Sequence, residues 1–309
     1  QSPLMININI ENEYSRLKTV ILGIADDLGV PPKESDAYDP RSLYHIKNNS
    51  YPFEDDLLRE VDSFHNKLIK HNVDIIRPDN INNCNQIFVR DLGFVISNLF
   101  FLSNIVPNRY DELKGINDTL KNLDVGVIKL PEFMHIEGGD VIVHNDKVFI
   151  GTYTEDDYSS LITARTNYSS IDYLKKMITT KEIIPLELKK SNTDIYKNTL
   201  HLDCCLQIIG KNKAIIHPEA FTFKDDYLWL VDFFGKQNIF EISDNEMYDM
   251  TSNVLSINHE TVISQPKFKR LNNWLKYQNL NVEEIDLSEV SKQEGLFRCS
   301  SLPLIRYDE

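Results

Sequence analysis

The feature of this sequence that most constrains its fold is the alternation of short, β-rich runs with amphipathic helical segments along all 309 residues. Several of the β-rich runs are paired across short polar turns, at His144-Asn-Asp146 and at Gly210-Lys-Asn-Lys213, as the strands of β-hairpins are. We expect strands at residues 17–22, 73–76, 93–97, 141–143, 147–150, 206–209, 214–216 and 260–263. Hairpins interleaved with helices in this way predict an α/β or α+β fold.

Two segments, residues 53–69 and 267–275, carry the hydrophobic period of a helix that is buried on one side. In the first segment the apolar residues spaced three and four apart are Leu57, Val61, Phe64 and Leu68. The helix before the β-rich residues 72–78 is matched late in the chain by a helix before residues 280–286. This correspondence indicates repeated structural units.

We expect a single domain over residues 5–309. No stretch rich in Pro, Gly or Ser interrupts the chain, and a closed α/β architecture reaches this length. Residues 31–51 form a long polar segment that begins with two prolines. We expect this segment to run over the surface, where long loops are mobile or functional.

The charge of the chain favours some partners over others. Acidic residues outnumber basic ones 47 to 33, for a net charge of -14, which argues against binding to nucleic acid. An acidic cleft would attract a small cationic substrate, although acidic residues also serve solubility alone. No apolar run approaches the roughly 20 residues of a membrane span, and residues 1–5 lack the pattern of a signal peptide. We therefore expect a soluble, cytoplasmic protein.

The four cysteines are Cys84, Cys204, Cys205 and Cys299, too few and too irregularly spaced for a disulfide framework. Cys204 and Cys205 are adjacent, and neighbouring residues on a strand point to opposite faces, so the two thiols are poorly placed to bind one metal ion. We expect them to be small buried strand residues.

Cys299 lies close to the end of the chain, and three motifs upstream of it contain carboxylates. These motifs are Phe88-Val-Arg-Asp91, Glu137-Gly-Gly-Asp140 and His201-Leu-Asp203. The adjacent Arg298 is expected to favour the thiolate of Cys299, although a buried, unreactive cysteine is the commoner case. A thiol, an imidazole and several acids are what attack on a cationic carbon with nitrogen leaving groups requires.

Each motif has a structural explanation beside the functional one. Asp91 is expected where a strand ends and points into a cleft, although a surface Arg-Asp pair would look the same. The two glycines after Glu137 allow close approach of a ligand, or simply form a tight turn. His201 and Asp203 are expected on one face of a strand that continues to residue 209, unless His201 is a satisfied structural histidine. His217 ranks lower, because no carboxylate has the same spacing to it.

The three motifs, Arg165-Thr-Asn167 between them and the C-terminal Arg298-Cys299 together resemble the guanidine-modifying (pentein) superfamily of amidinotransferases and arginine deiminases. Residues 14–23, 30–32, 76–79 and 250–255 resemble glycine amidinotransferase, so the resemblance runs nearly from end to end. It implies an α/β fold in which five ββαβ-type units form a five-fold pseudo-symmetric propeller around a central substrate channel.

The resemblance also implies a role for each motif residue. Cys299 would attack the guanidinium carbon and form a covalent amidino-thioether, while Asp91 and Asp203 hold the guanidinium. His201 would protonate the departing amine and then activate the incoming nucleophile, with Glu137 orienting it. Supporting candidates around the substrate are Asp140, Arg165 and Arg298. No metal or organic cofactor is implied.

The sequence leaves three alternatives for the function: an amidinotransferase, a hydrolase and a protein that is not an enzyme. The end-to-end similarity favours an amidinotransferase that moves the amidino group of arginine, or a related guanidino compound, to a small amine. Glu137 and the Arg298-Cys299 pair instead resemble arginine deiminases, which are hydrolases. The His201-Leu-Asp203 motif speaks against the dimethylarginine hydrolases, which differ at its third position. A catalytically silent binding protein of the same fold would not need all these residues. A homo-oligomer is compatible with the sequence.

Overall fold

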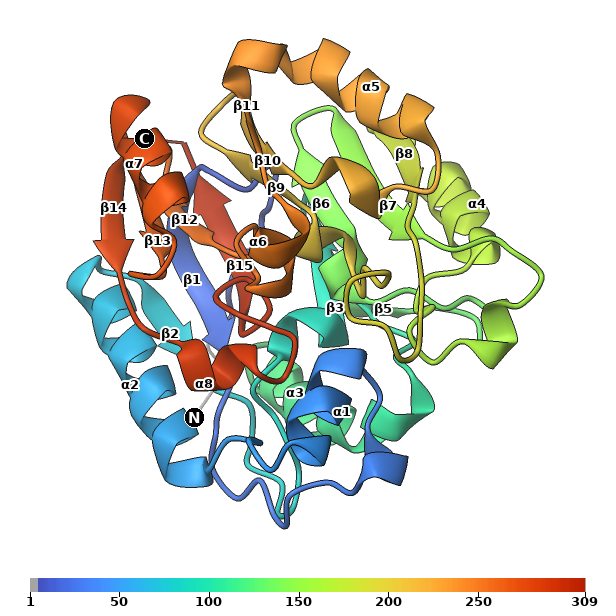
Figure 1. Cartoon of the computed structure of the whole chain (residues 1–309), viewed down its shortest axis with the longest axis vertical. Helices are drawn as coiled ribbons and strands as arrows, with labels where there is room; N and C mark the ends of the chain where they lie inside the picture. Colours follow the sequence, from blue (N-terminus) through green and yellow to red (C-terminus); the bar gives the residue numbers. More distant parts are fainter. Residues whose placement is uncertain (1–4, 309) are drawn as a thin grey trace.

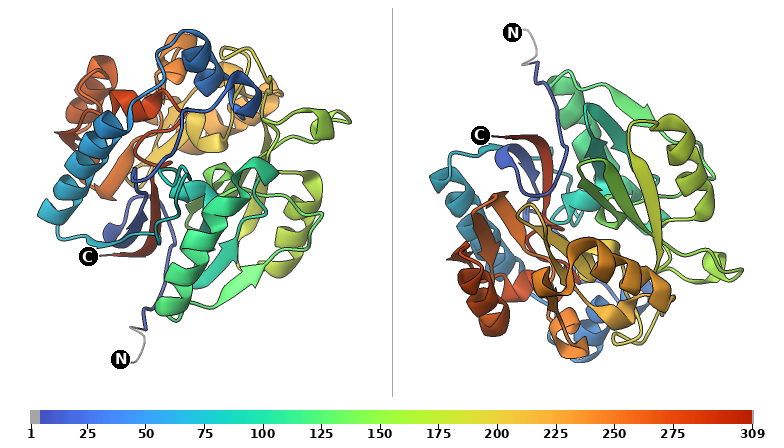
Figure 2. Two further views of the ribbon diagram at one scale, coloured as in Figure 1. Left: turned by 90° about the horizontal axis from the view of Figure 1, so that it is seen from below. Right: turned by 90° about the horizontal axis from the view of Figure 1, so that it is seen from above.

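In the computed structural model, which describes residues 5–308, five three-stranded sheets surround a common centre (Figures 1 and 2). The strands, sheet by sheet, are β15 (Ser301–Tyr307), β1 (Arg16–Leu22) and β2 (Asp74–Ile76); β3 (Gly93–Ile96), β4 (Leu99–Leu102) and β5 (Val127–Lys129); β6 (Val141–His144), β7 (Lys147–Thr152) and β8 (Glu182–Glu187); β9 (Leu206–Ile209), β10 (Lys213–Ile216) and β11 (Ile239–Glu241); β12 (Leu255–Asn258), β13 (Thr261–Ser264) and β14 (Asn281–Glu284).

Every sheet follows the same plan. Its first two strands are antiparallel, its third strand is parallel to the second, and a helix connects the second strand to the third. The connecting helices lie at the periphery (Figure 1) and are α2 (Glu54–Lys70), α3 (Tyr110–Asn122), α4 (Tyr168–Met177), α5 (Lys224–Phe234) and α7 (Lys269–Tyr277). This arrangement confirms the five-fold propeller of ββαβ-type units and the repeat between residues 72–78 and 280–286.

The two ends of the chain close the ring. The C-terminal strand β15, red in Figure 1, pairs with the blue strand β1 near the N-terminus, so the first unit is built from both ends. Strand β15 also contacts β3, and β1 contacts β12, so the closing sheet joins the units on its two sides. The ring therefore has no free end at this sheet.

Local sequence explains the elements that were predicted. The predicted helix from residue 53 is α2, and it buries Leu57, Val61, Phe64 and Leu68 against the sheets. The hairpin turns at residues 144–146 and 210–213 adopt the left-handed conformation at Asn145 (φ 56°) and Gly210 (φ 57°), residue types that tolerate it well.

All three motifs lie in tight turns. This differs from the expectation that Asp91 ends a strand and that His201 and Asp203 lie on one, and it agrees with the tight turn considered for the glycines after Glu137. Single 3-10 turns cover Val89–Leu92, Gly138–Asp140 and Leu202–Cys204, and the following strands begin only at β3, β6 and β9. The reason is that the backbone bonds elsewhere: the Arg90 N–H donates to the Cys299 carbonyl (3.1 Å), and the Cys204 N–H to the His201 carbonyl (3.1 Å). Cys204 and Cys205 are buried, as expected, but lie before strand β9.

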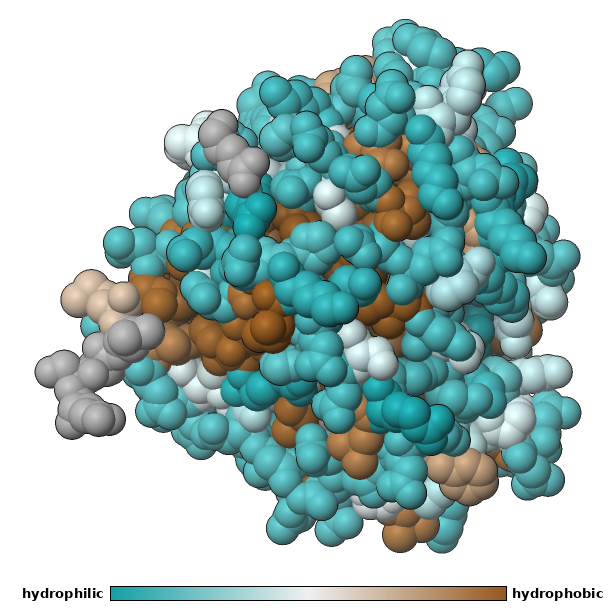
Figure 3. Space-filling view, turned by 90° about the vertical axis from the view of Figure 1, so that its left-hand side faces the viewer, coloured by the Kyte–Doolittle hydropathy of each residue, from teal (hydrophilic) through white to brown (hydrophobic). Residues whose placement is uncertain are grey.

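The remaining helices, α1 (Pro40–Lys47), α6 (Asp244–Tyr248) and α8 (Ser288–Ser291), lie outside this repeating plan. Hydrophilic residues cover most of the face in Figure 3, with hydrophobic residues confined to limited patches. Within residues 5–308, none of the helices is both long and apolar enough to span a membrane. Residues 1–4, at the start of the segment searched for a signal peptide, lie outside the described part.

Candidate active site

Four of the turns that precede the first strands of the sheets bring the motif residues together. The Cys299 Sγ lies 3.6 Å from Asp203 Oδ2, and the His201 Nε2 lies 2.7 Å from Glu137 Oε1. The other imidazole nitrogen, Nδ1, is 3.6 Å from Asp91 Oδ1. All five side chains are buried. The fold thus gathers a thiol, an imidazole and three carboxylates from four segments distant in sequence.

The carboxylates around His201 favour its protonated form. Burial by itself would lower the pKa of His201, but Asp91, Glu137 and Asp140 outweigh burial and raise that pKa above its ordinary value. Because Nε2 is bound to Glu137, the nitrogen that is free to exchange a proton with a ligand is Nδ1. The imidazolium is therefore suited to act as a general acid.

Glu137 is held by three partners. Besides His201, Oε1 accepts a hydrogen bond from Arg165 (2.9 Å), and Oε2 accepts one from the Val106 N–H (2.8 Å). Burial alone would raise the pKa of Glu137, but Arg165 and His201 together lower it, so the carboxylate stays ionised. Glu137 can then fix the orientation of the imidazole without giving up its charge.

The two glycines of Glu137-Gly-Gly-Asp140 make room for protein groups. A Cβ on Gly138 would lie 1.9 Å from the Arg90 carbonyl oxygen, and one on Gly139 would lie 2.6 Å from Asp91 Oδ1 and 2.8 Å from the His201 ring. The sequence predicted close approach of a ligand, whereas the close neighbours here are the adjoining turns. These glycines allow Asp91 and His201 to meet.

One oxygen of Asp91 has no hydrogen-bond partner among the described residues, although it lies 3.6 Å from His201 Nδ1. Its Oδ2 accepts a hydrogen bond from Arg109 (2.7 Å), which also forms a bidentate pair with Glu112 and donates to the Phe88 carbonyl. Its Oδ1 is buried without a hydrogen bond. A buried polar atom without a partner costs about 1–3 kcal/mol, or more when charged, so Asp91 Oδ1 is a ready acceptor for a ligand N–H group.

Arg298 favours the thiolate of the neighbouring Cys299, as the sequence suggested, but larger effects outweigh it. Its guanidinium pairs with Asp203 Oδ2 (3.0 Å) and Glu13 Oε1 (2.6 Å), and with Arg90 it holds the pKa of Glu13 at about 2 against burial. Burial, followed by the charges of Asp203 and Asp91, raises the pKa of Cys299 well above its usual range. Arg298 lowers this pKa only in part, because two carboxylates offset its charge, and Cys299 remains a resting thiol.

The three residues predicted to support the substrate site, Asp140, Arg165 and Arg298, form hydrogen bonds with other groups of the protein. Asp140 accepts hydrogen bonds from Thr166 Oγ1 (2.7 Å) and the Leu202 N–H (2.9 Å). Arg165 donates to Glu137 and to the backbone carbonyls of Ile162 and Tyr38, and Arg298 is paired as described. These contacts let Asp140, Arg165 and Arg298 position the motif residues, and their place around the substrate stays a prediction. His217 likewise has structural partners, the Ile242 carbonyl and Asp244.

Sequence reasoning missed Asn253, Arg109 and Glu112. The fully buried Asn253 accepts hydrogen bonds from the N–H groups of Leu296 and Cys299 (both 3.1 Å) and donates to the Asp203 carbonyl (3.2 Å). It occupies, in the fifth unit, the turn that carries the motifs in the others. The similarity of residues 250–255 to glycine amidinotransferase was the available signal, whereas Arg109 and Glu112 lie in no motif.

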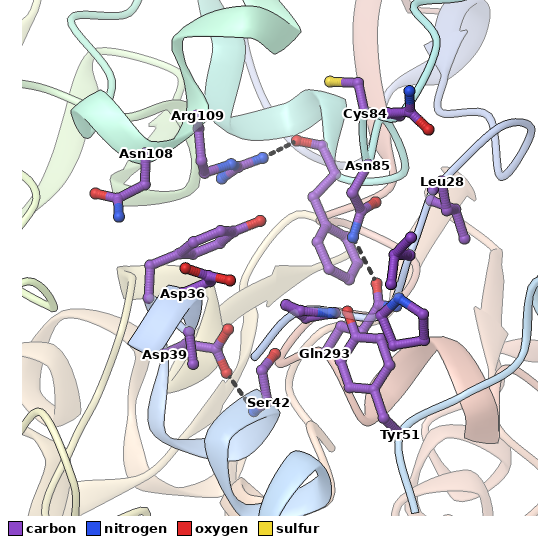
Figure 4. Close-up of a pocket in the computed structure, with 18 of the residues that line it drawn as sticks. Leu28, Asp36, Asp39, Ser42, Tyr51, Cys84, Asn85, Asn108, Arg109 and Gln293 are labelled. Atoms are coloured by element: carbon purple, nitrogen blue, oxygen red, sulfur yellow. Dashed lines mark hydrogen bonds between the residues drawn. The ribbon is translucent and has the colours of Figure 1, made fainter. Parts of the chain in front are cut away.

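A pocket of about 640 Å³ lies outside this buried cluster (Figure 4) and is lined by residues from 28–39, 51–54, 83–88 and 108–112, and by Ser42 and Gln293. Arg109 lines the pocket and bonds Asp91, so it connects the two. The polar segment 31–51 thus forms part of the pocket wall, and its Tyr38 carbonyl accepts a hydrogen bond from Arg165 (2.7 Å).

In residues 5–308 no group of three or more His, Cys, Asp or Glu side chains could hold a metal ion.

Known proteins are similar to this chain in sequence and in fold. The family model for eukaryotic N,N dimethylarginine dimethylhydrolase matches residues 41–306. The uncharacterized protein YkgA of Bacillus subtilis (strain 168) is 33% identical over 270 residues, 84% of this chain and 86% of that protein. An arginine deiminase of Metamycoplasma hominis is 26% identical over 208 residues, 57% of this chain and 48% of that enzyme.

Two solved structures have the same fold over nearly the whole chain. SxtG, an amidinotransferase from Microseira wollei in the saxitoxin biosynthetic pathway, superposes with a TM-score of 0.74 at 18% identity, covering 98% of each chain. The N-terminal domain of ArgZ, an arginine dihydrolase from the ornithine-ammonia cycle in cyanobacteria, superposes with a TM-score of 0.77 at 16% identity, covering 93% of this chain and 97% of that one.

Proposed function

Because this chain belongs to the N,N dimethylarginine dimethylhydrolase family of the guanidine-modifying (pentein) superfamily, we propose that it is a cysteine-dependent enzyme that hydrolyses a C–N bond of a small guanidino compound such as arginine. The observation that carries the proposal is the buried cluster that holds the Cys299 thiol, the His201 imidazole and Asp91 Oδ1, a carboxylate oxygen without a hydrogen bond. A protein that only binds guanidines has no need of the thiol.

Substrate binding generates the nucleophile. A guanidinium that donates to Asp91 Oδ1 and lies against Asp203 places a positive charge beside Cys299. That charge offsets the two carboxylates that help to raise the pKa of Cys299. The thiol then loses its proton to water in the pocket, and Sγ attacks the central carbon of the guanidinium.

His201 donates a proton to the leaving group and later accepts one from the attacking water. As the C–N bond breaks, the imidazolium gives the proton on Nδ1 to the departing ammonia or amine and leaves a cationic amidino-thioether on Cys299. The neutral imidazole then removes a proton from a water molecule, whose oxygen attacks the same carbon. The C–S bond breaks and restores the thiolate, the hydroxyl group on the carbon loses its proton to water in the pocket, and a neutral ureido product remains. Glu137 keeps Nε2 occupied throughout, so the exchange takes place at Nδ1.

Hydrolysis is favoured over transfer by the family and by particular residues. Glu137 and the Arg298-Cys299 pair resemble arginine deiminases, and arginine deiminases are among the sequence relatives. The His201-Leu-Asp203 motif, whose third position was expected to differ from dimethylarginine hydrolases, lies within residues 41–306 that match the family model, so it bears on the substrate and not on family membership. Amidinotransfer, which the end-to-end sequence pattern favoured, is the second candidate. It uses the same intermediate, and the 640 Å³ pocket has room for an amine acceptor.

Mass spectrometry of the products tests these alternatives. The protein is incubated with isotopically labelled arginine, with and without small amines such as glycine, and Cys299→Ser serves as the inactive control. Citrulline and ammonia, unaffected by added amine, would support hydrolysis, whereas ornithine with a new labelled guanidino product would support transfer. Failure to form a Cys299 adduct with any of a panel of guanidines would contradict the covalent mechanism and favour a binding protein.

A further inference from the structure

We propose that the interior of the ring contains a binding site for one small monovalent anion of the size of chloride, enclosed by Arg90, Arg306 and Glu13. The site is a cavity of about 20 Å³ that is also lined by apolar residues of β3, β6 and β15, strands that lie near the centre of the ring (Figure 1). It shares no lining residue with the 640 Å³ pocket. Such a site is independent of the proposed reaction.

Three guanidinium nitrogens of the cavity lining have no hydrogen-bond partner among residues 5–308. They are Nη2 of Arg90 and both Nε and Nη2 of Arg306, and the two side chains are buried. Elsewhere these guanidiniums bond backbone carbonyls: Arg90 Nε donates to Arg298 (3.1 Å) and Arg306 Nη1 to Ser15 (2.8 Å). Buried donors of a charged group are costly to leave unsatisfied, so these nitrogens are suited to bind an acceptor.

The buried charges around the cavity do not balance. Arg90, Arg298 and Arg306 carry three positive charges. The carboxylates that act on them most strongly are Glu13 and Asp203, both bonded to Arg298, and they carry two negative charges. Three minus two leaves one positive charge in the interior, where a charge without a counter-charge is costly. One monovalent anion would restore neutrality.

The guanidiniums keep their charge at neutral pH. Burial and the charge of Arg298 lower the pKa of Arg90 to about 9 and that of Arg306 to about 10, both still above 7. Glu13 also lines the cavity, but its Oε1 accepts a hydrogen bond from Arg298 (2.6 Å), and its charge is included in the balance above. An anion would therefore meet a net positive environment.

The size of the cavity limits the ligand. About 20 Å³ exceeds the roughly 10–15 Å³ that one water molecule requires, and a chloride ion is only slightly larger than a water molecule. Phosphate, sulfate and organic carboxylates are larger, and buried side chains such as Phe94, Val95 and Val143 form the walls. A water molecule would satisfy some of the donors but leave the excess charge, whereas a halide ion meets both requirements.

An anion at this site would connect segments that are far apart in the sequence. Arg90 lies in the turn before β3, Arg306 lies on the closing strand β15, and Glu13 precedes β1. The backbone N–H of Arg90 also donates to the carbonyl of Cys299 (3.1 Å). We therefore expect the anion to stabilise the closed ring.

Thermal unfolding at constant ionic strength tests the inference. Sodium gluconate, whose anion is too large for the cavity, is replaced stepwise by sodium chloride or sodium bromide. We expect Tm to rise by a few degrees, increasing with the logarithm of the halide concentration above the dissociation constant, because the ligand binds the folded protein alone. Equal Tm values in chloride and gluconate would overturn the inference.

A pair of variants assigns the effect to the cavity. Arg306→Gln removes the excess charge and unpartnered donors, so we expect the halide-dependent rise in Tm to be lost. Arg59→Gln removes an exposed arginine on α2 and should keep the wild-type rise. A rise that persists in Arg306→Gln would show that the halide acts elsewhere, as general salt effects do, and would overturn the assignment. Circular dichroism establishes that both variants are folded.

Bromide locates the site in the wild-type protein, which keeps the proposal testable if Arg306→Gln does not fold. Crystals soaked in sodium bromide are measured at the bromine absorption edge. An anomalous peak between Arg90 and Arg306, together with the halide-dependent rise in Tm, supports the site. Water alone in the cavity, or a peak without any rise in Tm, which would mean binding at crystal concentration only, would overturn it.

Discussion

At the residue scale, the reactivity of Cys299 depends on whether a cation is bound beside it. Burial and the charges of Asp203 and Asp91 raise the pKa of the resting thiol. We therefore expect Cys299 to react slowly with iodoacetamide at neutral pH, and several-fold faster when guanidinium ion or a guanidino ligand occupies the site. The measurement is the alkylation rate at Cys299, followed by peptide mass spectrometry.

The alkylation experiment needs a matched background, because Cys84 lines the pocket. Burial raises the pKa of Cys84 to about 12, so it should be unreactive with or without ligand. A Cys84→Ser variant removes this thiol from the assay. If Cys299 is already reactive without ligand, or if guanidinium slows its alkylation, activation by the substrate charge is contradicted.

A second prediction concerns the acceptor Asp91 Oδ1. Replacing Asp91 by Asn keeps the shape but removes the charge opposite the guanidinium, and hydrogen bonds to charged groups contribute about 1.5–3 kcal/mol. We expect Asp91→Asn, made in the Cys299→Ser background, to weaken guanidine binding by roughly tenfold to a hundredfold. Calorimetric titration measures the dissociation constant, and an unchanged value would remove Asp91 from the substrate site.

The third prediction concerns the proton on His201. Glu137 is one of the carboxylates that raise the pKa of His201 against burial. In Glu137→Gln that contribution is lost, so the pKa of His201 should fall and the imidazole should lose its proton at a lower pH. Titration of the imidazole by NMR follows the change, with His217, whose partners are the Ile242 carbonyl and Asp244, as an internal reference. A higher pKa in the variant would contradict this role.

At the element scale, the tight turns determine how closely the motifs approach. In Gly139→Ala the new Cβ would lie 2.6 Å from Asp91 Oδ1 and 2.8 Å from the His201 ring, so one of these groups must move. Because displacements of this size disrupt catalysis, we expect kcat/KM to fall by about a hundredfold or more. Gly126→Ala is the control, since its Cβ would meet nothing within 4 Å. Similar steady-state constants for both variants would show that the close approach is unimportant.

The sequence predicts the helices and strands that have a clear hydrophobic period and misses strands that lack one. Strand β14, with the sequence Asn281-Val-Glu-Glu284, is short and mostly polar because it lies at a sheet edge, and β15 contains Pro303, which argues against a strand. The register between β1 and β15 shifts beside the position of that proline. Such edge strands are determined by the neighbouring units, which a single segment of sequence does not reveal.

In the candidate site, too, local sequence reveals some features and contacts with distant residues determine the others. Cys299, His201, Glu137, Asp91 and Asp203 lie in motifs whose residue types carry chemistry, so they could be found without a structure. The partners that surround these residues in the structure could not be predicted from the sequence. Arg298 appears beside Cys299 in the sequence, yet its guanidinium binds Glu13 and Asp203, which lie 285 and 95 residues away in the chain. The pKa of Cys299 is raised first by burial and then by Asp203 and Asp91, and these effects outweigh the adjacent Arg298. The sequence suggested both a thiolate favoured by Arg298 and a buried thiol, and could not weigh one against the other.

At the scale of the whole molecule, the chain is a closed ring and not an open array of repeats. In an open array a destabilising change affects mainly its own and neighbouring repeats. Here β15 and β1 join the two ends of the chain, and the turns of successive units bond one another around the centre. Loss of the closing sheet should therefore destabilise every unit, which is also what the predicted single domain over residues 5–309 implies.

This difference can be measured with Leu304→Ala. Leu304 is a fully buried residue of the closing strand β15, and such a substitution costs about 2–5 kcal/mol of unfolding free energy. We expect native-state hydrogen exchange in β7, in the third sheet, to lose as much protection as exchange in β1, because both open only with the whole ring. Tyr277→Ala, at an exposed position on α7, should leave both strands protected. Loss of protection in β1 with β7 unaffected would mean that the units unfold separately, and substrate binding in one sector could then leave the others unchanged.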